Sequence, residues 1–131
     1  MNYLVDTQIL LWSFLDSRKI SNDVKSIFIN EDNKIFYSPI SLWEISIKFA
    51  LKKLLLSGGT PEDFFLELNN SFYRCKAMEP NTLISIYKLP FYHKDPFDRY
   101  LIWEAIRNDL TLISTDVKMK LYEREGLKAT L

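Results

Sequence analysis

The segment Asn2-Tyr3-Leu4-Val5-Asp6 is a short apolar run that ends at an acidic residue. A run of this kind is consistent with a buried strand of a parallel sheet. Residues 34–37 and 111–114 have the same strand-like character, and helical stretches lie between the three segments. Because strands alternate with helices through short loops, we predict an α/β domain. It has three layers, with a mostly parallel central sheet flanked by helices.

Capping patterns predict where several helices begin. Ser38-Pro39 combines an N-cap residue with proline at the first helical position, and its helix is expected to reach about Lys53. Thr60-Pro61-Glu62-Asp63 is a second cap signature, and Asp95-Pro96 opens a helix to about Asn108. We also predict helices over residues 9–14, from Ser21, over 81–87 and after Thr115, and an extended segment over 72–78.

Length and composition limit the alternatives. The 131 residues predict one domain, spanning 1–131, and the 17 basic and 17 acidic side chains give zero net charge. A protein that coats nucleic acid would be markedly basic, so any contact with nucleic acid must come from a local site. No apolar run approaches the roughly 18 residues that span a bilayer. The first residues lack a signal peptide's basic region, and the single cysteine cannot form an internal disulfide, so we expect a cytoplasmic protein without a membrane partner.

Acidic residues follow two of the predicted strands. Asp6 comes directly after residues 2–5, and Asp116 follows residues 111–114 after one threonine. Ligands of open α/β sheets bind outside the carboxyl ends of the strands, so both acids could face one crevice. Aspartate is also a favoured N-cap, and capping of the next helix explains each acid equally well when it is taken alone.

Two further acids lie on predicted helices. Asp98 shares an arc with Leu101, Ile102 and Ala105, whereas Tyr100, Glu104 and Arg107 fall on the other side. A carboxylate on an inward face requires a partner or a metal, although capping by the first turn also explains an acid there. Glu44 lies on a narrow polar strip with Ser41, Lys48 and Lys52, where a solvated pair with Lys48 is the simpler interpretation.

The helix that begins at Ser38 is apolar on two sides. A broad stripe contains Ile40, Trp43, Ile47, Ala50, Leu51 and Leu54, and a second patch contains Leu42, Ile45 and Phe49. Such a helix is either central in the core or in contact with a partner. Both interpretations remain open from the sequence.

The four acids occur in the order strand–Asp, helix–Glu, helix–Asp, strand–Asp. The segments that carry them are Tyr3-Leu-Val-Asp-Thr-Gln-Ile-Leu-Leu-Trp12, Ser38-Pro-Ile-Ser-Leu-Trp-Glu-Ile45, His93-Lys-Asp-Pro-Phe-Asp-Arg99 and Leu112-Ile-Ser-Thr-Asp116. Together they resemble the PIN-domain ribonucleases, and more closely the VapC-type toxins of bacterial type II toxin–antitoxin systems. The resemblance covers nearly the whole chain.

The resemblance implies that Asp6, Glu44, Asp98 and Asp116 form an acidic metal site with catalytic roles. It implies hydrolysis of RNA to a 5′-phosphate and a 3′-hydroxyl, with Mg²⁺ or Mn²⁺ activating a water. Asp95 is interpreted first as an N-cap, and His93 as a hydrogen-bonding residue of the loop. Gln8 departs from the serine, asparagine or histidine that often follows at this position.

The residue types agree with this chemistry. Two carboxylates about 4 Å apart repel by about 4 kcal/mol at an effective dielectric near 20, so converging acids require a cation. Oxygen ligands favour Mg²⁺ or Mn²⁺ over Zn²⁺, and a cation held in this way can activate water against a phosphodiester.

The resemblance also implies partners. We expect an RNA substrate, a small antitoxin of the VapB type and a homodimer. An acidic site needs nearby positive charge to attract the RNA backbone. The candidates are Lys48, Lys52, Lys94, Arg99 and Lys118.

Other classes of protein fit less well. A phospho-accepting receiver domain would want an aspartate near the middle of the chain, where residues 45–56 contain no acid. A haloacid-type phosphatase would want Asp-x-Asp after the first strand, and Gln8 occupies the second position. A non-toxin RNA-processing nuclease of the same fold, and a catalytically silent module that binds RNA or protein, remain as alternatives.

Overall fold

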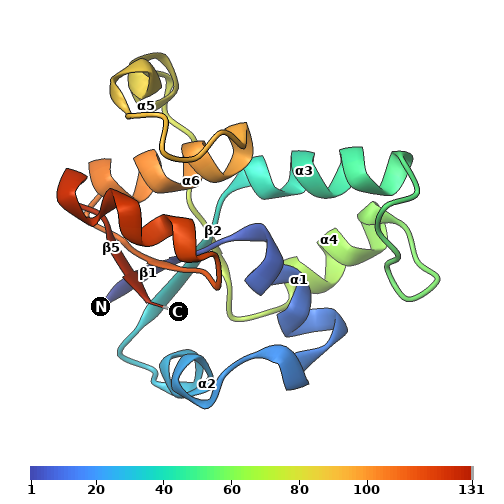
Figure 1. Ribbon diagram of the computed structural model, residues 1–131. Helices are drawn as coiled ribbons and strands as arrows, with labels where there is room; N and C mark the ends of the chain where they lie inside the picture. The colour runs from blue at the N-terminus through green and yellow to red at the C-terminus, as the bar shows by residue number, and fades with distance from the viewer. Residues whose placement is uncertain (131) are drawn as a thin grey trace.

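The computed structural model describes residues 1–130, which form a five-stranded sheet with helices around it (Figure 1). The strands lie in the order β3-β2-β1-β4-β5, and every neighbouring pair is parallel. The predicted α/β architecture is therefore confirmed. The strands are β1 (Asn2–Val5), β2 (Lys34–Tyr37), β3 (Arg74–Cys75), β4 (Thr111–Ile113) and β5 (Lys128–Thr130).

Helices cover the sheet from both sides. In Figure 1, α5 and α6 lie above the strands, whereas α1, α2 and α4 lie toward the right and the bottom of the view. Within residues 1–130 no helix combines the length and the apolar character needed to cross a membrane. The α-helices are α1 (Thr7–Leu15), α2 (Asn22–Ile29), α3 (Pro39–Ala50), α4 (Pro61–Asn69), α5 (Pro80–Ser85) and α6 (Pro96–Arg107), and the 3₁₀ segments are η1 (Ser17–Lys19), η2 (Ile86–Lys88) and η3 (Val117–Glu125).

The side chains of β1, the central strand, point alternately to the two faces of the sheet, and the core is divided into two clusters accordingly. Tyr3 and Val5 of β1 pack on the side of α1, α2 and α4, whereas Leu4 packs on the side of α6 and η3. Successive side chains of a strand point to opposite faces, which makes β1 the boundary between the two clusters. The largest fully buried side chains of the second cluster include Leu101 and Tyr122.

The predicted helix starts are confirmed at the caps of α3, α4 and α6, where proline follows the N-cap residue. The Ser38 hydroxyl accepts a hydrogen bond from the N–H of Ile40 at 3.1 Å. Thr60 and Asp63 form a complete capping box, with reciprocal bonds of 3.2 and 3.0 Å. These caps fix the entry of α3 and α4 by local contacts alone.

The helix expected to reach about Lys53 ends earlier, at Ala50. Lys52 adopts a left-handed conformation with φ 59°, and its N–H bonds to the carbonyl of Phe49. The N–H of Lys53 bonds back to the carbonyl of Lys48. This pair of bonds is a Schellman ending, which occupies the last carbonyls of α3 and turns the chain away.

Two other segments differ from the prediction. The segment after Thr115 is a 3₁₀ helix, and its buried residues Met119 and Tyr122 are spaced by three, one turn of such a helix. The extended segment expected over residues 72–78 pairs as a strand only at β3. Strand β5 was not predicted, because three residues at a sheet edge carry too little pattern to distinguish them from a loop.

Helix α6 buries more of its surface than expected. Tyr100 and Glu104, assigned to the polar side, are both buried. The Tyr100 hydroxyl and the Asn108 amide each donate to Glu104 Oε2 at 3.2 Å, and Lys76 Nζ lies 3.8 Å from Oε1. Burial raises the pKa of Glu104, and the positive charge of Lys76 opposes this shift.

Helix α3 packs through its second patch. Ile45 is buried and Leu42 and Phe49 pack against the first core cluster, whereas Trp43 and Leu51 of the broad stripe are about 60 % exposed. Part of the broad stripe therefore faces outward, and its exposed side chains form an apolar surface that a partner could cover.

Candidate active site

A cavity of about 260 Å³ opens beside the carboxyl ends of β1 and β4. All four acids singled out in the sequence line it, although they come from four separate elements of the chain. The lining consists of Asp6, Thr7, Gln8, Leu11, Glu44, Lys48, Asp95, Asp98, Thr115 and Asp116. The structure thus brings together residues up to 110 positions apart.

Asp6 lies at the centre of the sheet and is almost fully buried. Its backbone N–H continues the ladder to the carbonyl of Ile113 at 3.0 Å, and its Oδ1 accepts from the N–H of Ile9 at 2.8 Å. The carboxylate therefore caps α1 and lines the cavity at the same time. In the sequence, capping and a functional role are alternatives for Asp6, but the position of this carboxylate in the structure allows it to serve both.

Glu44 is buried on the side of α3 that faces the cavity. Lys48 Nζ lies 2.7 Å from its Oε2, whereas its Oε1 is buried and has no hydrogen-bond partner within the described residues. The expected pair with Lys48 is present, but the glutamate is not solvated as the simpler interpretation supposed. An orphaned buried oxygen is costly unless a proton or a cation occupies it.

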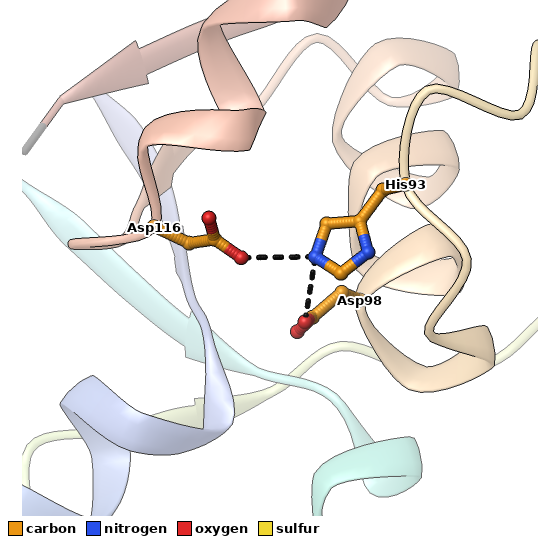
Figure 2. Close-up of side chains that lie close together, drawn as sticks. All are labelled: His93, Asp98 and Asp116. Carbon is orange, nitrogen blue, oxygen red and sulfur yellow. Dashed lines mark hydrogen bonds and ion pairs between the residues drawn. The ribbon is translucent and has the colours of Figure 1, made fainter.

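Asp95 and Asp98 occupy the first turn of α6. Asp95 is the N-cap, and its Oδ1 accepts from the N–H groups of Phe97 and Asp98 at 2.9 and 3.0 Å. Asp98 Oδ2 lies 3.1 Å from His93 Nε2, at the wall of the cavity (Figure 2). The first turn of α6 thus holds one acid for capping and directs a second toward the other carboxylates.

Asp116 follows β4 and caps η3. Its Oδ1 accepts from the N–H of Lys118 at 2.9 Å, and its Oδ2 lies 2.9 Å from His93 Nε2. Ser114 was not singled out in the sequence, yet its buried hydroxyl accepts from the N–H of Asp116 at 3.1 Å. The same side chain acts to lower the pKa of Asp6 and opposes the effect of burial. A small hydroxyl residue at the end of a strand, two positions before an acid, is the signal that could have indicated it.

His93 lies between the carboxylates of Asp98 and Asp116 (Figure 2). Ligand atoms of these three residues lie within 4.8 Å of one another, and they are the one such group found among residues 1–130. Its position as a hydrogen-bonding residue agrees with the sequence interpretation, but its contacts with two of the four acids were not anticipated. The short spacing His93-Lys-Asp-Pro-Phe-Asp98 is the signal that could have indicated them.

The electrostatics of the cavity favour protonation or a cation. Burial raises the pKa of Asp6 to about 6, with smaller contributions from Glu44 and Asp116. Burial, followed by the charge of Asp95, raises the pKa of Asp98 to about 7. Partial burial acts upward on Asp116 as well, but the Lys118 N–H and the His93 ring hold its pKa below the ordinary value.

The donor set fits a hard divalent cation. It offers carboxylate oxygens and no thiolate, since the single cysteine, Cys75, is exposed on β3 at another place in the fold. A bound cation would give the orphaned Oε1 of Glu44 a partner and would stabilise the charged forms of Asp6 and Asp98, whose pKa values are raised. The residues present therefore fit Mg²⁺ or Mn²⁺.

Arg99 is not available to RNA, contrary to the expectation from the sequence. Its guanidinium is buried and donates to the carbonyls of Leu89, Pro90 and His93 at 3.0, 2.9 and 3.2 Å, and it lies 3.7 Å from the ring centroid of Phe91. These hydrogen bonds from Arg99 fix the conformation of the loop that carries His93. Lys48 lines the cavity, and the exposed Lys52, Lys94 and Lys118 remain candidates for contact with a phosphate backbone.

Comparisons with known proteins show which family and which fold the chain shares. The family model for the PIN domain matches residues 3–125. A chain of VapBC2 from Rickettsia felis, bound to a DNA fragment from their promoter, is 18% identical, with a TM-score of 0.68 over 99% of this chain and 98% of that one. A chain of VapBC-1 from nontypeable Haemophilus influenzae is 18% identical, with a TM-score of 0.69 over 99% and 97%. A chain of FitAcB from Neisseria gonorrhoeae is 19% identical, with a TM-score of 0.65 over 100% and 97%. At these identities the solved structures show a shared fold, and no curated protein matches the sequence.

Proposed function

Because this chain belongs to the PIN domain family, we propose that it is an endoribonuclease that depends on Mg²⁺ or Mn²⁺. The observation that carries the proposal is the convergence of Asp6, Glu44, Asp98 and Asp116 on one cavity at the carboxyl edge of a parallel sheet. Burying several carboxylates close together lowers the free energy of unfolding, so a role in function explains these residues better than a role in stability does.

Each acid receives a role from its surroundings. Asp6 and Asp98, the two with strongly raised pKa values, would hold the cation, and Asp116 would complete its surroundings. When bound, the cation supplies a Lewis acid for phosphodiester hydrolysis. Glu44 Oε1, which has no hydrogen-bond partner among the described residues, is suited to contact the cation and to help position the attacking water. Lys48 Nζ, paired with Glu44 at the cavity wall, is suited to contact a phosphate oxygen.

A cleavage assay tests the proposal. Wild-type protein should cut single-stranded RNA only with Mg²⁺ or Mn²⁺ and leave 5′-phosphate ends, and Asp6→Asn and Asp98→Asn should each reduce the rate by 100-fold or more. Asp109→Asn is the matched control, because this aspartate is exposed, pairs with Lys128 and does not line the cavity. Cleavage without a divalent cation, or cleavage that survives both substitutions, would contradict the proposal.

The cleavage assay and a growth assay together separate the two alternatives within the fold. A catalytically silent module would bind RNA without cutting it under any cation. A processing nuclease without a toxin role would cut RNA in vitro but would not arrest growth when expressed in cells. We propose the toxin role, with a cytoplasmic site of action because its substrate is RNA, and induced expression followed by mapping of 5′-phosphate ends tests it.

We further propose that a small antitoxin of the VapB type inhibits the enzyme. The solved relatives are named as VapBC and FitAB assemblies. Apolar hollows of about 280 and 450 Å³ lie between α3 and α4 and at the end of α3. Leu55, 85% exposed, lines the second hollow. Leu55→Asp should weaken the complex with the antitoxin at least tenfold, whereas Ile29→Asp, at a similarly exposed position on α2, should not.

A homodimer is the remaining part of the proposal. Trp43 is 60% exposed and makes an edge-to-face contact with Phe97, with ring centroids 5.4 Å apart. Ile84 and Tyr87, in α5 and η2, are about 75% exposed. Light scattering should give the mass of two chains for the wild type and of one chain for Ile84→Asp. A wild-type monomer at micromolar concentration would contradict the dimer but not the nuclease.

A further inference from the structure

His93 is the single histidine of the chain, and its ring contacts two of the acids that line the cavity. We propose that His93 is a positioning residue that donates its Nε2–H to the carboxylates of Asp116 and Asp98, and that it is not a ligand of the cation. The inference deepens the proposed function and rests on the acids having the role given there. Two observations carry it: the partner of the second ring nitrogen, and the way the loop is held.

The other ring nitrogen determines where the proton lies. The backbone N–H of Asp95 donates to His93 Nδ1 at 3.2 Å. A nitrogen that accepts this bond carries no hydrogen, so the proton of the neutral ring is on Nε2. Nε2 then faces Asp116 Oδ2 at 2.9 Å and Asp98 Oδ2 at 3.1 Å as a donor.

The same contact argues against coordination of a metal. A neutral imidazole that binds a cation through Nε2 must carry its proton on Nδ1, and it then donates that proton to an acceptor. Here Nδ1 faces an N–H group, and two donors would meet at 3.2 Å. The close grouping of His93, Asp98 and Asp116 therefore reflects hydrogen bonding by the ring and not a three-ligand metal site.

The backbone of His93 is fixed as firmly as its ring. The Tyr122 hydroxyl accepts from the His93 N–H at 2.8 Å and donates to the carbonyl of Pro90 at 2.7 Å. Arg99 Nη1 donates to the His93 carbonyl. Tyr122 belongs to η3, which begins after Asp116, and Arg99 follows Asp98 in α6. The two elements that supply the acids thus also hold the residue that bridges them.

This arrangement gives His93 a specific task. A single donor shared between two carboxylates from different elements keeps both oxygens at a set separation, and it restrains two like charges that would otherwise move apart. Residues that orient metal-binding carboxylates in this way are typically worth 10- to 100-fold in cation affinity or activity.

Nuclear magnetic resonance of protein labelled with ¹⁵N-histidine tests the proton position directly. The label reports His93 alone, because the chain has no other histidine. We expect a ring protonated at Nε2 and free at Nδ1 in the metal-free protein, and the same pattern after addition of Mg²⁺. A proton on Nδ1 in either state would overturn the proposal. This measurement needs no nuclease activity, so its failure is distinguishable from failure of the proposed function.

Two substitutions separate the donor from the rest of the ring. His93→Gln places an amide donor near the position of Nε2, whereas His93→Asn keeps an acceptor for the Asp95 N–H but cannot reach the carboxylates. Titration calorimetry with Mn²⁺ should show affinity reduced by less than about threefold for the glutamine variant and by about tenfold or more for the asparagine variant. Tyr92→Phe, which removes an exposed hydroxyl beside the same loop, should leave the affinity unchanged.

Electron spin echo measurements on bound Mn²⁺ provide the complementary result. We expect no coupling to an imidazole nitrogen in the wild type, since His93 does not coordinate the cation. A nitrogen coupling that disappears in both variants would overturn the proposal in favour of a ligand. Equal loss of affinity in the two variants would overturn it in favour of a purely structural residue. Absence of any Mn²⁺ binding would instead contradict the proposed function, and the proton position would still decide the role of His93.

Discussion

Arg99→Lys should destabilise the protein strongly although it conserves the charge. The guanidinium is 5% exposed and donates to the carbonyls of Leu89, Pro90 and His93. Nη1 makes two of these bonds and Nη2 makes the third, whereas a lysine has one nitrogen on a flexible stem and can reach at most two of the three carbonyls. The substitution therefore leaves at least one of the three carbonyls without a charged donor.

The magnitude follows from that lost bond and from the contact with the Phe91 ring. A hydrogen bond to a charged group contributes about 1.5–3 kcal/mol. Loss of the contact with the Phe91 ring adds roughly 0.5 kcal/mol, for a total of about 2–3.5 kcal/mol. At about 3 °C per kcal/mol for a chain of this size, the melting temperature should fall by about 6–10 °C.

Urea denaturation and thermal melting, both followed by circular dichroism, measure the change. Arg107→Lys is the matched control, because Arg107 is exposed on the same helix and lies 5.7 Å from the Trp103 ring centroid. Its effect should stay within about 0.5 kcal/mol. A loss below about 1 kcal/mol for Arg99→Lys, or one equal to that of the control, would refute the reasoning about the three carbonyls.

Three further changes test individual features of the fold. Burial raises the pKa of Glu104, so the wild type loses stability as pH rises from the carboxyl's ordinary value of 4.5 through the higher folded value. Glu104→Gln, which cannot ionise, should therefore gain stability relative to the wild type as pH rises above 4.5 in urea titrations, and a difference that does not change with pH would contradict this. Thr60→Ala removes the capping-box hydroxyl of α4 and should cost about 1 kcal/mol in thermal melting, whereas Thr60→Ser should cost little. Gly126→Ala should lower the free energy of unfolding, measured by chemical denaturation, by about 1–2 kcal/mol. The cause is backbone strain alone, because Gly126 has φ +98° and an added methyl group meets nothing within 4 Å. An unchanged denaturation midpoint would show that the turn relaxes.

Features with local signals could be predicted from the sequence. The caps at Ser38, Thr60 and Asp95 are each determined by a few adjacent residues, and the structure forms all three. The shared edge of Asp6 and Asp116 also followed, because parallel strands place their carboxyl ends together. That Glu44 and Asp98 join them from helices was implied by the resemblance to the PIN-domain ribonucleases, and the structure brings all four to one cavity. The roles of these acids in metal binding and catalysis stay predictions.

Features that depend on tertiary contacts could not be predicted. The pattern of α6 places Glu104 opposite the apolar arc, and only the packing of α5 and the segment near Lys76 against that side buries it. The burial of Arg99 depends on carbonyls that a loop brings to it from up to ten residues away. A pattern on one helix shows which side chains share a face, but not how many faces the rest of the chain will cover.

The order in which the cavity is assembled has a consequence for synthesis on the ribosome. Asp6 emerges early, but the wall that carries Asp116 is anchored through the bond from the Ser114 N–H to the carbonyl of Thr130 and through the pairing of β4 with β5. A nascent chain shorter than 130 residues therefore lacks part of that wall's support. Pairing of β5 therefore completes the support of the wall that carries Asp116, and we expect the four acids to reach their final positions only after that step.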